Sequence, residues 1–194
     1  MNILKKIGLG LIAVVVFLAV VGLLAFPRIT EVKRSLTMQA PADLIFDQVN
    51  NLKKNEAWSP WKDPSMKISY GLITEGPGAR SSWVSKKMGN GTMTIRDIVP
   101  NSSINIDLDF GSRGKPKVLW IFVSEGEGVK VFEMMSEDTG FNPLKRWMSL
   151  ITQRVVGPAF EKGLASLKEV VETQAAALKV EQAKTQEASV APAD

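Results

Sequence analysis

The residues that most often perform chemistry are scarce in this chain. None of its 194 residues is a histidine or a cysteine. This excludes a serine–histidine–aspartate triad, a cysteine nucleophile and an imidazole-ligated metal. Acid–base chemistry would fall to carboxylates, to lysines or to Tyr70, the single tyrosine. The glycine-rich segments 76–78 and 89–91 are typical of turns and match no phosphate-binding fingerprint. The sequence predicts no metal and no cofactor.

Glu133 is the carboxylate with the most unusual predicted surroundings. Residues 129–135 alternate along a predicted strand, and Glu133 falls on the apolar face of that strand. Burial there would raise the pKa of its carboxyl group, as is typical of functional acids. A structural ion pair with Arg80 or Arg96 is the simpler interpretation.

Five tryptophans and several methionines offer a second set of candidates. Core packing is the simpler interpretation of these side chains. The alternative is a cavity wall of indole rings and deformable methionines around an apolar ligand. Under that alternative, the predicted ligand-binding residues are Trp58, Trp61, Trp83, Met93, Trp120, Glu133 and Met148.

The elements that would position these residues can be read from periodicity. Residues 30–38 predict a strand, and Pro41 begins a short helix with apolar residues at helical spacing. Six strands separated by glycine, proline and asparagine follow, as an antiparallel meander. Their expected ranges are 66–73, 79–86, 92–99, 103–110, 117–124 and 129–136.

A long helix begins at Asn142-Pro143, a capping residue followed by proline at the first helical position. We expect Gly157-Pro158 to kink or restart it. One apolar stripe should cover the sheet before and after that point. Its expected members are Leu144, Trp147, Met148, Ile151, Val155, Phe160, Leu164, Leu167 and Val171.

Residues 7–26 contain no charge, amide or hydroxyl group. A helix of this length matches a hydrocarbon core of about 30 Å. A cleaved signal is the alternative, but its apolar region is usually about 7 to 15 residues long. We therefore predict a single-pass anchor. Because the short N-terminal tail is basic, the C-terminal domain should be extracytoplasmic.

Several short motifs occur in a characteristic order along residues 29–173. They are Asn55-Glu56-Ala57-Trp58-Ser59-Pro60-Trp61, Gly78-Ala79-Arg80-Ser81-Ser82-Trp83, Gly89-Asn90-Gly91-Thr92-Met93-Thr94-Ile95 and the segment from Gly157 to Lys168. Together they resemble the polyketide cyclase/dehydrase-like branch of the START/Bet v1-like (SRPBCC) superfamily. The resemblance implies an α+β helix-grip fold, in which a curved antiparallel sheet wraps around a long C-terminal helix, with a deep apolar cavity. Phe132 departs from the pattern, at a position that often holds tryptophan, and the anchor is an addition.

The expected organisation is an anchor at 1–28, a ligand-binding domain at 29–173, and a helical extension with a disordered end at 174–194. The favoured function is binding of a hydrophobic small molecule or lipid beside a membrane, without chemistry. The alternatives are a cyclase/dehydratase-type enzyme using Glu133 or Tyr70, and a protein-interaction module whose cavity its own side chains fill. The formal net charge of +4 is modest and spread along the chain, so we expect no nucleic-acid partner.

Overall fold

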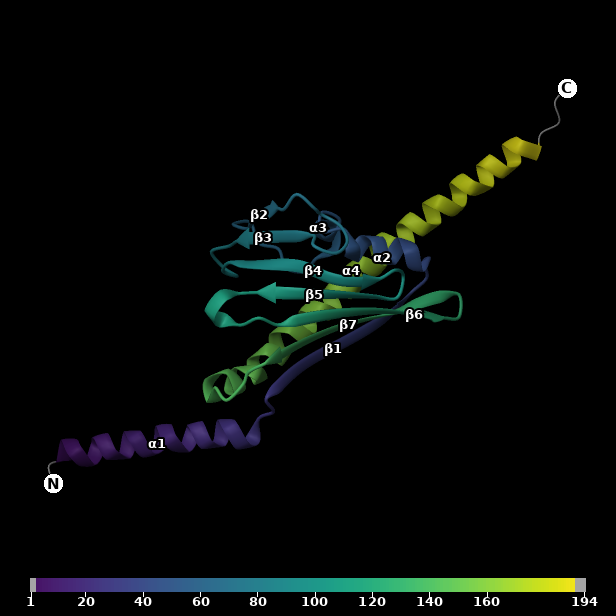
Figure 1. The fold of residues 1–194 in the computed structure, drawn as a ribbon. Helices are drawn as coiled ribbons and strands as arrows, with labels where there is room; N and C mark the ends of the chain where they lie inside the picture. Colours follow the sequence, from purple (N-terminus) through teal and green to yellow (C-terminus); the bar gives the residue numbers. More distant parts are fainter. Residues whose placement is uncertain (1–2, 191–194) are drawn as a thin grey trace.

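The computed structural model describes residues 3–190. It consists of one seven-stranded antiparallel sheet, a long helix across one face of that sheet, and an apolar helix that extends away from one end (Figure 1). This is the helix-grip arrangement expected from the sequence.

The strands follow one another across the sheet almost in chain order. Their bounds are β1 Ile29–Met38, β2 Lys67–Tyr70, β3 Arg80–Val84, β4 Gly91–Val99, β5 Ser103–Asp109, β6 Lys117–Glu125 and β7 Gly128–Asp138. The spatial order is β1-β7-β6-β5-β4-β3-β2, so β2 to β7 form a meander and β1 pairs with its last strand. A two-residue turn at 126–127 joins β6 to β7, as the glycines there predict.

The helices are α1 Ile3–Ala25, α2 Ala42–Asn50, α3 Asn55–Trp58 and α4 Pro143–Val190, with a 3₁₀ turn η1 at Gly111–Arg113. The short helices α2 and α3 both pack against α4. The Asn142 side chain accepts a hydrogen bond from the Lys145 backbone N–H at 3.2 Å, which confirms the predicted cap of α4. The expected end of the domain at residue 173 falls inside α4, and residues 191–194 lie outside the described residues.

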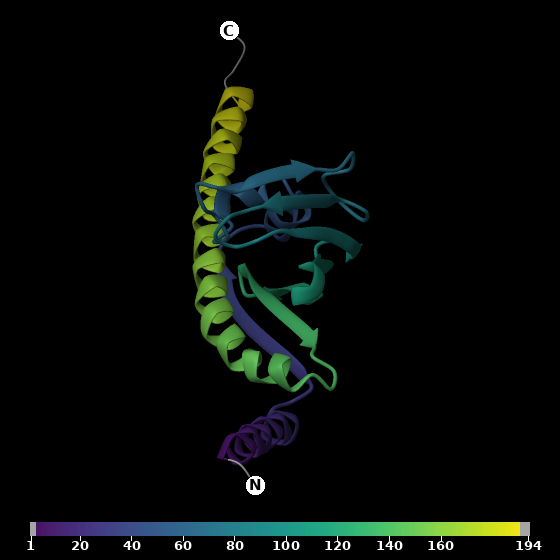
Figure 2. The same cartoon turned by 90° about the vertical axis from the view of Figure 1, so that its left-hand side faces the viewer.

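The predicted interruption of the long helix does not occur. α4 continues through Pro158 as one element and curves along the inner face of the sheet (Figure 2). A proline removes one backbone hydrogen bond, and a long helix that wraps around a core can absorb this loss as curvature.

The face of the sheet that α4 covers, here called the inner face, holds most of the core. Cross-strand partners share a face, so Val32, Met135 and Val118 lie together, as do Val131 and Phe122. From α4 the core receives Phe160, Leu164, Leu167 and Val171, all at most 3% exposed. This part of the predicted stripe is confirmed.

The first part of the predicted stripe faces away from the sheet. At 100° per residue, positions 144, 148, 151 and 155 lie on the face of the helix opposite positions 160, 164, 167 and 171. The side chains of this outer stripe, which also includes Phe141 before the helix, are between 48% and 81% exposed. Its members are Phe141, Leu144, Met148, Ile151 and Val155. The expectation that one continuous stripe covers the sheet is therefore wrong.

Helix α1 is long and apolar enough to cross a membrane, with a mean hydropathy of 3.0 and almost no buried surface. A signal sequence near an N-terminus would have the same properties. α1 leaves the sheet at the end where β1 begins, and it contacts the rest of the chain at the start of α4 (Figure 1).

Candidate functional site

Two buried tryptophans form the centre of an aromatic wall between the sheet and the helices. Trp120, on the inner face of β6, meets Trp58 of α3 edge to face, with ring centroids 5.6 Å apart. The indole N–H of Trp58 donates to the Gln48 carbonyl at 3.2 Å, which holds the ring in place. Phe46 of α2 and Phe122 of β6 make a second edge-to-face pair at 5.6 Å. The wall is therefore built from one strand and two short helices, and its rings pack in the geometry that aromatic pairs prefer.

Glu133 lies at the edge of this wall. It is the cross-strand partner of Trp120 on one side and of Arg34 on the other, so all three share the inner face. The residue is only 7% exposed. Desolvation alone perturbs its carboxyl group, with no contribution from a hydrogen-bond or charged partner within the described residues. Burial raises the pKa of Glu133 well above its usual value, because desolvation penalises the charged form. Burial therefore favours the neutral form of this carboxyl group over its charged form.

The cross-strand arginine beside Glu133 is directed elsewhere. The Arg34 Nε donates to Glu161 of α4 at 2.6 Å, and its Nη1 donates to the Lys33 carbonyl at 2.8 Å. The side chain passes beneath α4 at Gly157, where a Cβ atom would overlap the guanidinium group. Because Gly157 has no side chain, it leaves room for the Arg34 side chain to reach Glu161. This is the glycine that was expected to kink the helix.

The expected partners of Glu133 were wrong. Arg96 pairs with Asp107 on the opposite face, with its Nε 2.7 Å from the carboxylate. Arg80 lies on β3, separated from β7 by three strands. Arg34, which the sequence analysis did not single out, is the arginine adjacent to Glu133. The alternation Val32, Arg34, Leu36 and Met38 places it on the inner face and could have identified it.

The other predicted ligand-binding residues are only partly brought together. Trp61 and Met93 are half-buried and pack against the core that contains Trp58 and Trp120. Trp83 lies near the end of β3, where it meets Phe110 edge to face at 5.7 Å. Met148 belongs to the outer stripe of α4 and is 48% exposed. Trp58, Trp120 and Glu133 are thus neighbours on the inner face. Trp61 and Met93 border the same core, Trp83 lies at its end, and Met148 lies outside it.

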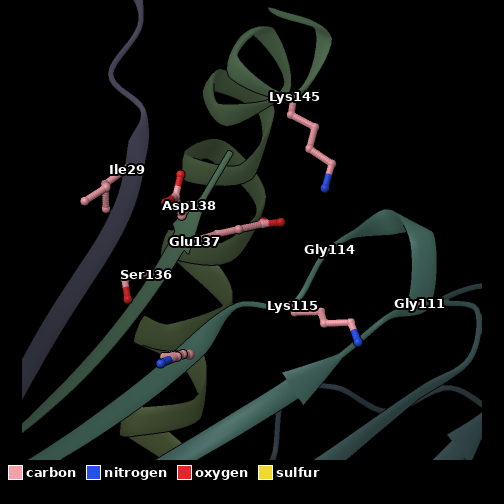
Figure 3. A pocket seen from close by; sticks show the side chains of 9 residues that line it. Ile29, Gly111, Gly114, Lys115, Ser136, Glu137, Asp138 and Lys145 are labelled. Atoms are coloured by element: carbon pink, nitrogen blue, oxygen red, sulfur yellow. The ribbon is translucent and has the colours of Figure 1, made fainter. Parts of the chain in front are cut away.

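A pocket of about 520 Å³ opens at the end of the sheet from which α1 leaves (Figure 3). The side chains of Lys115, Glu137 and Lys145 surround the opening, and Gly111 and Gly114 form its rim. Lys115 pairs with Asp109 at 2.8 Å, outside the pocket lining. This polar pocket is not the apolar cavity that the resemblance implies.

The sequence matches the family described as "Polyketide cyclase / dehydrase and lipid transport" over residues 30–172, which include all seven strands except Ile29 and most of α4. No curated protein matches the chain.

Solved structures share the fold at low sequence identity. Protein CV1439 from Chromobacterium violaceum has a TM-score of 0.56 and 11% identity, covering 74% of this chain and 98% of its own. Ara h 8.0201 has a TM-score of 0.53 and 13% identity, covering 75% and 99%. The di-domain ARO/CYC protein StfQ of the steffimycin biosynthetic pathway has a TM-score of 0.58 and 12% identity, covering 76% and 52%. These similarities show the shared fold.

Proposed function

The chain belongs to the family described as "Polyketide cyclase / dehydrase and lipid transport", and on this basis we propose that it binds a hydrophobic small molecule or lipid on the inner face of its sheet, without chemistry. The family description names both enzymes and carriers, so the choice between them depends on the residues of this site. The similar protein StfQ is an ARO/CYC protein of a biosynthetic pathway, and it represents the enzymatic alternative.

The observation that carries the proposal is the buried, unpartnered carboxyl group of Glu133 beside the aromatic wall. Apolar and aromatic side chains supply affinity in proportion to the apolar area that a ligand buries on them. One neutral carboxyl group in such surroundings orients a ligand by donating to its single polar end. A hydrophobic molecule with one hydroxyl or carbonyl oxygen satisfies both requirements.

The distribution of titratable groups favours binding over catalysis. Tyr70, the other candidate acid, lies on β2, which four strands separate from β7. Its hydroxyl donates to the Glu56 carboxylate, and burial together with this hydrogen bond raises the pKa of the tyrosine. Tyr70 and Glu133 are therefore not arranged as a catalytic pair, because general acid–base partners must both reach one substrate.

We further propose that α1 anchors the domain in a membrane and that the domain is extracytoplasmic. The length and hydropathy of α1, together with its almost complete exposure, support the anchor. An anchored carrier takes a hydrophobic molecule directly from the bilayer, where such molecules are concentrated.

Photocrosslinking tests the proposed binding. The full chain is placed in lipid nanodiscs with a fatty acid that bears a diazirine in its acyl chain. We expect saturable crosslinks to peptides containing Met93, Trp120 or Glu133, and competition by the unlabelled fatty acid. Crosslinks confined to α1 and the start of α4 would contradict binding on the inner face. They would favour the interaction module whose interior is filled by its own side chains.

A further inference from the structure

The start of α4 is fastened to the last two turns of α1. The Arg146 guanidinium donates to the carbonyls of Leu23 and Phe26 at 2.5 and 3.2 Å, and also to the Gly140 carbonyl. It therefore caps the C-terminal end of α1, where carbonyl groups lack helical partners. Arg146 is only 7% exposed, so this contact is a packed junction.

A tryptophan extends the junction further along α1. The Trp147 indole N–H donates to the Leu18 carbonyl at 3.0 Å, and its ring meets Phe26 at 4.7 Å. Gly22 gives the indole room, because a Cβ atom there would come within 2.7 Å of its nitrogen. Leu18 lies seven residues before Ala25, which corresponds to about 10 Å along a helix. In a bilayer crossed by α1, the first turns of α4 would therefore lie beside the last two turns of the span, from the lipid interface into the adjoining acyl region.

The outer stripe of α4 begins at this same level. Leu144 and Met148 flank Trp147 in sequence and are 69% and 48% exposed, and Phe141 just before the helix is 81% exposed. Within the described residues these side chains have no apolar cover. If α1 crosses a bilayer, their position beside the end of α1 would place them against lipid rather than water.

The loops at the same end of the sheet carry positive charge. Because β3 and β5 end there and β4 and β6 begin there, the loops 85–90 and 110–116 lie on the side from which α1 leaves (Figure 1). Their exposed basic residues, with the half-buried Lys145 of α4, form a basic rim: Lys86, Lys87, Arg113, Lys115 and Lys145. Lys86 and Lys87 make no ion pair within the described residues, whereas Arg113 donates to the Met88 and Asn90 carbonyls and Lys115 pairs with Asp109.

The acidic groups at this end are mostly engaged within the protein. Asp109 pairs with Lys115 and Asp138 with Arg28, at 2.8 and 2.7 Å. Asp63 accepts hydrogen bonds from Ser65 and Ser85, and Glu137 lines the pocket of Figure 3. The loops at the opposite end instead carry Glu75 and Glu127, and Glu125 at the end of β6 pairs with Lys130 at 3.0 Å. The loops at the α1 end are therefore more basic than the loops at the opposite end.

We propose that the outer stripe and the basic rim form one docking surface for an anionic lipid bilayer. The apolar residues enter the acyl boundary, as in an interfacial amphipathic helix, and the lysines and arginine contact lipid phosphates. This surface holds the end of the sheet against the membrane. The inference rests on the proposed anchor, although not on ligand binding at the inner face.

The absence of cysteine makes site-specific labelling a direct test. Leu144→Cys and Met148→Cys of the full chain carry an environment-sensitive fluorophore in vesicles of phosphatidylcholine, with or without phosphatidylglycerol. Leu178→Cys is the matched control, an exposed leucine (47%) farther along α4. Val15→Cys within α1 reports independently whether the anchor is inserted. Lipids bearing nitroxide groups at known depths quench the fluorophores that contact them.

We expect blue-shifted emission and nitroxide quenching at positions 144 and 148, and water-like, unquenched emission at 178. Both effects should strengthen with phosphatidylglycerol, and Lys86→Gln/Lys87→Gln should weaken that dependence. Water-like emission at 144 and 148 with a quenched label at 15 would overturn docking while leaving the anchor intact. Labels that are shielded but unquenched, in a manner that depends on protein density, would overturn it in favour of contact between two copies.

Discussion

The most informative contrast in the molecule is between two charged residues that are neighbours on one face. Arg34 and Glu133 are cross-strand partners, yet Arg34 pairs with Glu161 of α4. Glu133 therefore has no charged partner beside the aromatic wall, and burial favours the neutral form of its carboxyl group. A buried carboxyl group without a partner costs stability, and its retention in such a position is typical of a functional group.

The raised pKa of the Glu133 carboxyl group should make the free energy of unfolding depend on pH. The pKa of Glu133 is raised in the folded state, so the unfolded state releases its proton first as pH increases. Its contribution to the free energy of unfolding is therefore fully present below the unfolded pKa and is lost as pH rises towards the folded value. Glu133→Gln should leave stability nearly unchanged at pH 4 and increase it at pH 8, as measured by urea unfolding. Glu127→Gln, at an exposed turn, is the control, and the same effect in both variants would contradict the assignment.

In the strands, local periodicity predicted which side chains lie on the inner face. It did not predict which of these side chains are in contact with one another. The alternation of β7 placed Glu133 on an apolar face, and the same rule applied to β1 would have found Arg34. The contact between Trp58 and Trp120 joins residues 62 positions apart in the sequence, and only the packing of α3 on the sheet creates it. The route of Arg34 beneath Gly157 likewise requires the position of α4 relative to β1.

Among the elements, α4 departs most from its sequence-based description. Its start, its cap and its inward residues after position 157 were predicted correctly. Residues 144–155 were assigned to the same face because apolar spacing shows that a helix has a stripe, without showing what the stripe faces. In the structure, the apolar residues from 160 to 171 pack on the sheet, whereas the outer stripe faces away from it and starts beside α1.

Two leucines of α4 provide a matched comparison. Leu164 is 1% exposed and Leu144 is 69% exposed. Leu164→Ala should lower the free energy of unfolding by about 2–5 kcal/mol, as for a buried large-to-small change. Leu144→Ala should change it by less than about 0.5 kcal/mol in detergent solution. Equal losses in urea unfolding would mean that the two faces of α4 are assigned incorrectly.

The gap at Gly157 can be tested by a double-mutant cycle. Gly157→Ala should destabilise the protein by about 1–3 kcal/mol, because the new methyl group displaces the Arg34 side chain. In an Arg34→Ala background the clash is absent, and alanine should be favoured over glycine in the helix by up to about 1 kcal/mol. Additive effects of the two substitutions would show that Arg34 does not pass beneath α4 at this position.

At the scale of the whole molecule, α1 and the domain form a connected unit. Arg146 and Trp147 tie α4 to α1, so the orientation of α1 in a membrane also sets the orientation of the sheet. Composition and hydropathy alone predicted the apolar helix at the N-terminal end, which the structure contains as α1. They could not predict this junction, because it joins residues more than 120 positions apart.

Membrane insertion of α1 and the side of the membrane on which the domain lies are two proposals, and each has its own test. If α1 spans the bilayer as proposed, the full chain should remain in the membrane fraction after alkaline carbonate treatment. A reporter that is active only outside the cytoplasm, fused after residue 194, should be active. A mature chain beginning near residue 26 would show a cleaved signal instead. Activity of a cytoplasm-dependent reporter alone would reverse the proposed orientation.

Native mass spectrometry of the full chain, released gently from its own membranes, tests the central claim most directly. We expect one bound hydrophobic molecule per chain, identifiable by fragmentation. The adduct should persist in Met148→Ala, on the outer stripe, and fall about tenfold or more in Trp120→Ala, because the ligand loses apolar contact area. Circular dichroism confirms that both variants are folded. A wild-type chain that carries no adduct, or an adduct equally abundant in both variants, would contradict ligand binding on the inner face.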